Sequence, residues 1–288
     1  MTASRDPFRE DRQADRARTI RAEGQDMPLV LRLKELRRVC KDTETFSSDD
    51  PQMIVPHSEA DVRSVRQYPI ETDPPDHTEY RALVEPMFRK PDQPEYQADM
   101  QSMIDAAVAD AIGREQIEVV REFSLPIQSR ALTRLLGVDD AEAEIWIGWG
   151  THVFKDGDGH AKGNQLQQYI ERKFHETRDS DGDDMFSTLN RAEFRGRPLT
   201  EEEKHGFANL AFAGGRDTVI HTISSIIAYL GEHPDALAFI REDPQRIITA
   251  TEEFVRYVSP LTVIARKCPH GGEAGGKQVN PGERLGLC

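Results

Sequence analysis

The chain has 288 residues, of which 37% are hydrophobic and 31% are charged, and its formal net charge is −14. Such acidity argues against nucleic acid or an anionic membrane surface as the main partner. No apolar stretch reaches the roughly 18 residues of a transmembrane helix, and the N-terminus lacks a signal-peptide core. Cys40, Cys268 and Cys288 are too widely spaced for a disulfide framework or a zinc site. We expect a cytoplasmic protein whose own side chains form no metal site.

In chain order, residues 1–27 are charged and poorly patterned, which indicates a loose arm or a short helix. Residues 28–288 are expected to form one domain, with a strand at 29–33 and a helix at 35–41. Asp73 is a predicted N-cap, with Pro74 at the first position of a helix that ends near Phe88. Further helices are predicted at 94–112, 124–136, 140–154, 164–178 and 184–194.

A long apolar helix is predicted from about residue 200 to 230, and a capping box of Thr200 and Glu203 opens it. A helix over 234–258 follows. Strands at 261–267 and 277–287 are separated by a glycine-rich loop. The expected fold class is therefore mainly α with small β-sheets.

Gly214 and Gly215 interrupt the long helix, although each glycine inside a helix costs roughly 0.8–1 kcal/mol relative to alanine. Such a pair predicts that something lies close against the backbone. One alternative is the close packing of a second helix. The hydroxyl of Thr218 can bond the carbonyl of Gly214, and with Asp217 beside it a proton relay is conceivable. The alternative is a kink without chemistry.

Two further pairs carry charge at helical spacing. His77 and Arg81 lie four residues apart, which predicts either a clamp for a carboxylate or phosphate or a solvated basic face. Glu253 and Arg256 lie three residues apart, and such surface pairs contribute little to stability. A strand that carries Arg266 follows this second pair.

Taken in order, these segments resemble the cytochrome P450 superfamily, the haem-thiolate monooxygenases, in its soluble bacterial form. The likeness covers about Pro28 to Cys288. It rests on segments that match family motifs in the family's order: Asp73-Pro74-Pro75-Asp76-His77-Thr78-Glu79-Tyr80-Arg81, Leu135-Leu136-Gly137-Val138, Asp183-Asp184-Met185-Phe186-Ser187, Gly214-Gly215-Arg216-Asp217-Thr218, Glu253-Phe254-Val255-Arg256 and Ala265-Arg266.

The resemblance implies haem b as the cofactor and assigns roles to these residues. His77, Arg81 and Arg266 would bind the haem propionates, and Gly214 and Gly215 would lie against the oxygen side of the haem. Thr218 would hydrogen-bond the oxygen bound there, and Asp217 would supply protons through water. Glu253 and Arg256 would be structural.

The family's axial ligand is a cysteine in a glycine-rich loop well downstream of the Glu-x-x-Arg helix. No cysteine here matches that motif, because Cys288 lies too close to Arg256. The resemblance therefore implies a C-terminally incomplete member that would be inactive as this chain alone.

The function implied for the complete protein is the insertion of one oxygen atom of O₂ into a small apolar organic molecule. A ferredoxin or a flavin-type reductase would supply the electrons. One alternative is a degenerate helical remnant that binds no haem or serves as an interaction scaffold. Another is a helical small-molecule-binding protein without redox chemistry.

Overall fold

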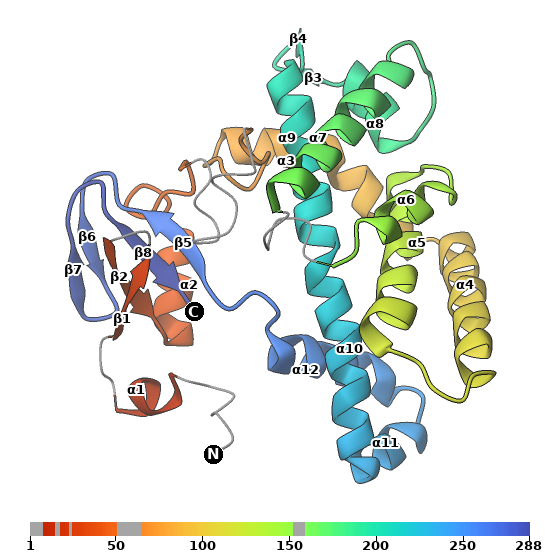
Figure 1. Cartoon of the computed structure of the whole chain (residues 1–288). Coiled ribbons are helices and arrows are strands. Elements are labelled where there is room, and N and C mark those ends of the chain that lie inside the picture. The colour runs from red at the N-terminus through yellow and green to blue at the C-terminus, as the bar shows by residue number, and fades with distance from the viewer. Residues whose placement is uncertain (1–7, 15–17, 23–24, 51–64, 152–158) are drawn as a thin grey trace. The chain divides into compact units, whose positions relative to one another are not determined.

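The structure, a computed structural model, describes residues 8–14, 18–22, 25–50, 65–151 and 159–288. The chain divides into two compact units, residues 1–81 with 262–288 and residues 82–261. Figure 1 shows helices predominating over small sheets, which confirms the predicted fold class. Within the described ranges, no helix is both long and apolar enough to cross a membrane.

The first unit is built on a four-stranded mixed sheet in the order β1-β2-β8-β5. β1 and β2 are antiparallel, β2 and β8 are parallel, and β8 and β5 are antiparallel, while β6 and β7 form a separate hairpin. The elements of this unit are α1 (Arg9–Gln13), β1 (Arg18–Ala22), β2 (Gln25–Val30), α2 (Leu33–Lys41), β5 (Ile264–Lys267), β6 (Gly272–Ala274), β7 (Lys277–Val279) and β8 (Arg284–Leu287). The expected N-terminal arm thus contains a short helix and strand β1.

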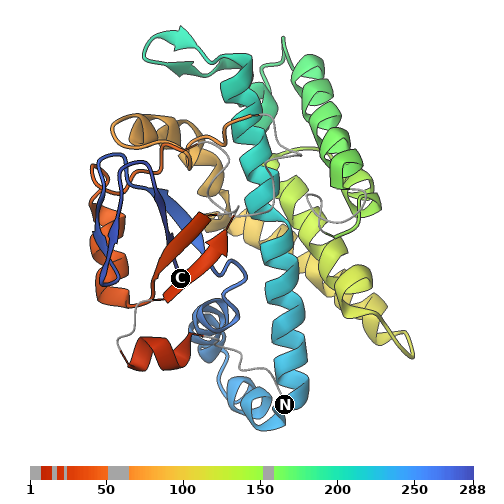
Figure 2. The ribbon, with the colours of Figure 1, turned by 60° about the vertical axis from the view of Figure 1, so that its left-hand side comes forward.

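The second unit is almost entirely helical. Its elements, with α3 beginning in the first unit, are α3 (Asp76–Phe88), η1 (Lys90–Asp92), α4 (Pro94–Ile112), η2 (Val119–Ser124), α5 (Leu125–Leu136), α6 (Glu142–Gly148), α7 (Gly159–Glu176), α8 (Met185–Arg191), β3 (Glu193–Phe194), β4 (Arg197–Pro198), α9 (Glu201–Gly215), α10 (Asp217–Glu232), α11 (Pro234–Arg241) and α12 (Arg246–Val258). Figure 2 shows α9 and α10 running as successive segments through this unit.

The core of the second unit is rich in aromatic side chains that meet edge to face. The ring centroid of Phe212 on α9 lies 5.0 Å from that of Trp146 on α6 and 5.7 Å from that of Tyr169 on α7. Phe186 on α8 extends this cluster toward Phe174. Such pairs add to the free energy gained by burying large apolar rings. The cluster therefore fixes α6, α7 and α8 around the helix that carries the glycine pair.

The helix predicted over 234–258 is wrong as a single element, because the structure has two helices, α11 and α12. Pro244 lies between them, and proline lacks the N–H that a continuous helix needs and disfavours helical geometry in the residue before it. The Asp243 carboxylate accepts a hydrogen bond from the Gln245 backbone N–H at 3.0 Å. This side chain supports the turn that reverses the chain.

The predicted N-cap at Asp73 is also wrong, because α3 begins at Asp76. The Asp73 carboxylate instead accepts hydrogen bonds from the Ser47 hydroxyl and from the Ser48 backbone N–H, the latter at 2.8 Å. Two consecutive prolines follow Asp73, and the second restricts the first to an extended conformation, which delays the helix. Asp73 therefore ties the approach to α3 back to residues 47–48.

Candidate functional site

The glycine pair lies where the predicted long helix divides into α9 and α10. Thr200 and Glu203 form the predicted capping box at the start of α9. At the far end Arg216 has φ −106° and ψ −85°, which is not helical, and α10 begins at Asp217. The sequence motif Gly214 to Thr218 therefore spans a junction between two helices.

The two glycines of this junction face different surroundings. A Cβ on Gly215 would lie 3.1 Å from Cδ1 of Leu132, a buried residue of α5. A Cβ on Gly214 would have no atom within 4 Å. Gly215 is therefore explained by close helix–helix packing, the alternative considered above. Only Gly214 borders space that a ligand could enter.

Side-chain hydrogen bonds satisfy backbone carbonyls at the junction between α9 and α10. The Thr218 hydroxyl donates to the Gly214 carbonyl at 2.7 Å, as predicted from the spacing. The Gln128 side-chain amide donates to the Gly215 carbonyl at 2.8 Å. Since a hydroxyl has one donor and two acceptor sites, Thr218 Oγ1 can still accept a hydrogen bond from water or a ligand. Thr218 therefore combines a structural bond with a free acceptor site beside Asp217.

Arg216 is the residue that the sequence analysis did not single out. It is 1% exposed, and its guanidinium donates to the carbonyls of Trp146 at 3.0 Å and Gly150 at 2.8 Å. Burial lowers its pKa to about 10, against a smaller opposing effect of Asp217. The sequence could have pointed to Arg216, because it is a charged residue in the middle of an apolar helix pattern. An arginine buried at such a position needs hydrogen-bond acceptors of its own.

A second group of predicted residues comes together in the first unit. The pKa of His77 is lowered, first by burial and then by the charge of Arg81, while Asp73 opposes the shift and Arg266 adds to it. Burial also lowers the pKa of Arg266, with Cys40 and Asp73 opposing it. The charges of Arg81 and Arg266 thus both act on the His77 imidazole. Such an arrangement favours a bound anion.

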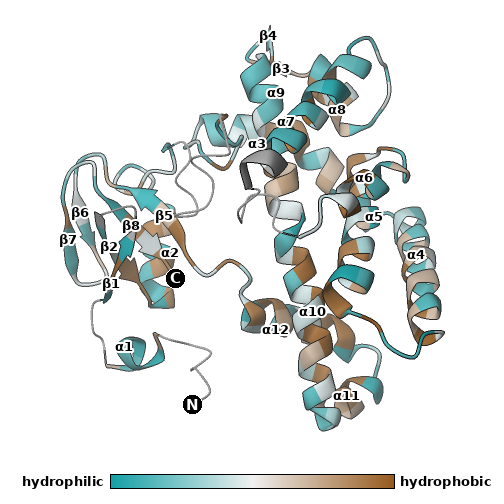
Figure 3. Cartoon of the chain, in the orientation of Figure 1, coloured by the Kyte–Doolittle hydropathy of each residue, from teal (hydrophilic) through white to brown (hydrophobic). Residues whose placement is uncertain are grey.

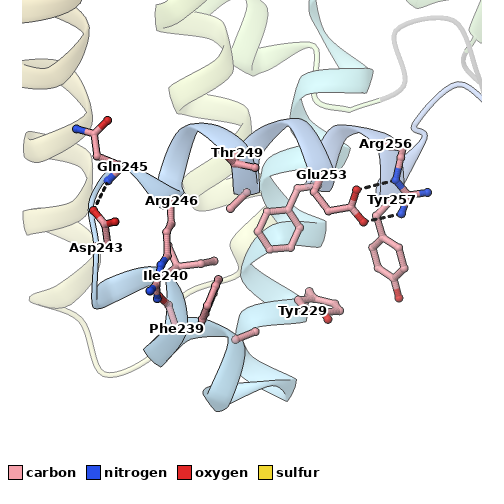
Figure 4. Close-up of a pocket in the computed structure, with 13 residues that line it drawn as sticks. Tyr229, Phe239, Ile240, Asp243, Gln245, Arg246, Thr249, Glu253, Arg256 and Tyr257 are labelled. Atoms are coloured by element: carbon pink, nitrogen blue, oxygen red, sulfur yellow. Dashed lines mark hydrogen bonds and ion pairs between the residues drawn. The ribbon is translucent and has the colours of Figure 1, made fainter.

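Glu253 and Arg256 form the predicted pair on α12, with both guanidinium–carboxylate contacts present at 2.6 and 2.5 Å. The mutual hydrogen bond lowers the pKa of Glu253 and raises that of Arg256. Figure 4 shows the pair at one end of a cavity of about 700 Å³ between α10, α11 and α12, which Tyr229 and Phe239 also line. Both side chains are mostly exposed, so the pair contributes little to the stability of this chain, and the structural role predicted for it stays a prediction.

None of the three cysteines forms a disulfide, and Cys268 is fully buried. Burial and then the charge of Glu283 raise the pKa of the Cys268 thiol to about 11. The Cys268 sulfur is enclosed by the apolar side chains of the sheet core, such as Phe46 and Leu285, and so has no opening toward a metal ion. In the part of the chain that the structure describes, no group of three or more His, Cys, Asp or Glu side chains could hold a metal ion.

No family model matches the chain. A solved structure described as "The structure of a carbohydrate active P450" is 41% identical to it, covers 98% of this chain and 74% of its own, and superposes with a TM-score of 0.91. The chain belongs to the cytochrome P450 family. The predicted resemblance is thereby confirmed.

Curated P450 relatives agree with this assignment. The monooxygenase PikC of Streptomyces venezuelae is 30% identical over 91% of this chain and 64% of its own length. Linalool 8-monooxygenase of Pseudomonas putida is 26% identical over 92% of this chain and 70% of its own length. The chain spans about 60% of the length of several curated P450s that it matches.

The P450 cofactor is haem b, and the described residues fit two of its parts. His77 and Arg266 are half-buried and Arg81 is exposed, and the charges of the two arginines act on the imidazole, which suits carboxylate groups such as propionates. Gly214 has open space where a side chain would begin. Cys268 does not fit the third part, the thiolate ligand, because it is enclosed in the apolar core of the first unit. His77, Arg81 and Arg266 belong to the first unit, and Gly214, Gly215, Asp217 and Thr218 belong to the second.

Proposed function

We propose that this chain provides the propionate-binding and oxygen-side residues of a P450 monooxygenase. The bound haem would supply oxygen activation for hydroxylation of a small organic molecule. The observation that supports this best is the grouping of His77 with Arg81 and Arg266, because the charges of both arginines act on the imidazole and an anionic ligand would relieve this repulsion.

The roles of the individual residues follow from their positions. Arg81 and Arg266 would hold carboxylates by charge-assisted hydrogen bonds, and His77 would add a donor. Gly214 would leave room on the oxygen side. Thr218 Oγ1 would accept a hydrogen bond from water there, and Asp217 would take up and release the proton that this water carries. Glu253 and Arg256 would be structural.

The substrate and the electron donor are further parts of this proposal. The sequence favoured an apolar molecule, in line with the name of the linalool 8-monooxygenase. The more similar solved structure is described as carbohydrate active, so an oxygen-rich molecule is a second substrate class. We propose a ferredoxin or a flavin-type reductase as the donor. Spectral titration of a haem-loaded protein with members of both substrate classes separates them.

A titration of the purified chain with haem and with haem dimethyl ester tests the central claim. The two ligands differ only in the carboxylates that the cations would recognise. We expect haem to bind at least tenfold more tightly than the ester, and Arg266→Gln to remove this difference. Arg114→Gln is the control, because Arg114 lies just after α4 and is ion-paired with Asp110 at the surface.

Equal affinity for the two ligands in the unmodified chain would contradict the proposed cation site. The degenerate-remnant alternative predicts no haem uptake during expression with a haem precursor and a partly unfolded product. A red-shifted Soret band of the reduced carbon monoxide complex would exclude that alternative for this chain.

A further inference from the structure

The carboxylate of Asp73 acts on two of the residues proposed to bind the propionates. Its charge opposes the lowering of the His77 pKa that burial, Arg81 and Arg266 produce. Together with Cys40 it also opposes the lowering of the Arg266 pKa by burial. Asp73 is half-buried and belongs to the same compact unit as His77 and Arg266. One acidic group therefore acts on cations from two elements, α3 and β5.

Hydrogen bonds hold this carboxylate against residues 47 and 48. The Ser47 hydroxyl donates to Asp73 Oδ2, and the Ser48 backbone N–H donates to Oδ1 at 2.8 Å. Ser47 is 6% exposed, so its hydroxyl is largely shielded from water. The backbone carbonyl of Asp73 accepts from the His77 N–H at 2.9 Å. Asp73 thus joins the first turn of α3 to residues 47 and 48.

Residues 47–50 are in turn fastened to the sheet that carries Arg266. Ser47 and Lys267 exchange two backbone hydrogen bonds, of 2.8 and 3.0 Å, at the end of β5. The Asp50 carboxylate, whose side chain is 12% exposed, accepts a hydrogen bond from Arg284 of β8 at 2.6 Å. Lys267 directly follows Arg266 in the chain. Asp73 therefore completes a connection from α3 through residues 47–50 to the strand of Arg266.

We propose that Asp73 is a positioning residue, which fixes α3 relative to β5 so that His77, Arg81 and Arg266 hold one anionic ligand together. The identity of that ligand rests on the proposed function. Binding groups on separate elements hold one ligand well when their spacing is set in advance, because ordering them during binding costs free energy. A negative charge at Asp73 would by itself weaken the binding of an anion. A positioning role and a merely repulsive charge therefore predict opposite effects of removing Asp73.

The first test measures the spacing in the haem-free chain through the NMR titration of His77. Since Arg266 lowers the His77 pKa, Arg266→Gln should raise it in the unmodified chain. If Asp73 sets the spacing of α3 and β5, this rise is lost in Asp73→Ala. Asp73→Asn retains it, because the asparagine oxygen still accepts from the Ser48 N–H. An Arg266→Gln effect that is equal in the unmodified and Asp73→Ala backgrounds, whether present or absent, would overturn the proposal.

The second test compares the affinities for haem and haem dimethyl ester. We expect Asp73→Ala to lower the preference for haem by about tenfold, the order expected for the loss of one charge-assisted hydrogen bond, and Asp73→Asn to keep the preference. A rise in Asp73→Ala would show a merely repulsive charge, and no change would reduce Asp73 to a role in fold stability. Either result would overturn the proposal. Asp42→Ala is the matched control, because Asp42 is another carboxylate of this unit that accepts a backbone N–H, from Thr45 at 3.1 Å.

Ser47→Ala is a milder variant for the case in which Asp73→Ala does not fold. It removes one donor to Asp73 and leaves the Ser48 bond and the charge of Asp73 in place. The preference for haem should fall by a smaller factor, and an unchanged preference would contradict positioning. Failure of the proposed function would appear as equal affinity for haem and its ester in the unmodified chain. Failure of the positioning role would appear in the His77 titration, which uses no haem.

Discussion

At the scale of single residues, Arg216 and Thr218 show which side-chain roles can be inferred from sequence. The bond from the Thr218 hydroxyl to the Gly214 carbonyl is local, and the four-residue spacing predicts it. The partners of Arg216 are one carbonyl on α6 and one just after it, about seventy residues earlier in the chain, so only tertiary structure reveals them. The same holds for Asp73. Its carboxylate accepts hydrogen bonds from Ser47 and Ser48 instead of capping a helix as predicted.

His77 carries a prediction about pH. Its lowered pKa means that, somewhat below pH 6.5, the folded chain binds fewer protons than the unfolded chain. The free energy of unfolding should therefore fall as pH decreases through 6.5 toward the folded-state pKa. NMR titration should place the His77 pKa below its usual value, and Arg81→Gln should raise it. An unchanged His77 titration in Arg81→Gln would contradict the assigned effect of Arg81.

At the scale of elements, the spacing of apolar residues predicted the helices well. Proline, glycine and capping residues predicted the ends of the helices less well. α4 coincides with the range 94–112 because proline starts it and a glycine follows it. The helix over 234–258 failed at Pro244, where the apolar pattern continues on both sides of the break and hides it. Short strands such as β6 escaped prediction because glycine-rich sequence reads as a loop.

Gly214 and Gly215 form a matched pair of test sites. Gly214→Ala meets no atom and gains helix propensity, so the free energy of unfolding should rise by up to about 1 kcal/mol. In Gly215→Ala the new methyl group would press against the buried Leu132. The free energy of unfolding should therefore fall by about 1 kcal/mol or more. Urea unfolding of both variants checks this. Equal effects of the two substitutions would contradict the different surroundings of the glycines.

At the scale of the whole molecule, exposed apolar side chains gather on α11 and α12. Phe239, Ile247, Ile248 and Val255 are between 50% and 69% exposed, and Figure 3 shows hydrophobic residues along α10 and α12. Contiguous apolar surface favours association. We expect the purified chain to self-associate and to bind a hydrophobic dye, and Ile248→Gln to reduce both, as measured by light scattering and dye fluorescence.

Ile112→Gln is the matched control, because Ile112 is 78% exposed at the end of α4. Its substitution should leave association unchanged. A strictly monomeric chain without dye binding would contradict the prediction.

The parallel pairing of β2 with β8 also has a consequence for synthesis on the ribosome. Leu29 pairs with Gly286, so the sheet of the first unit joins nearly opposite ends of the chain. The hairpin of β1 and β2 is made early, but its neighbour emerges only after all of α3 to α12. Domains generally fold as units during translation, so the helical unit would be complete while the hairpin still exposes an open edge. Chaperone protection during this interval would act on the N-terminal hairpin.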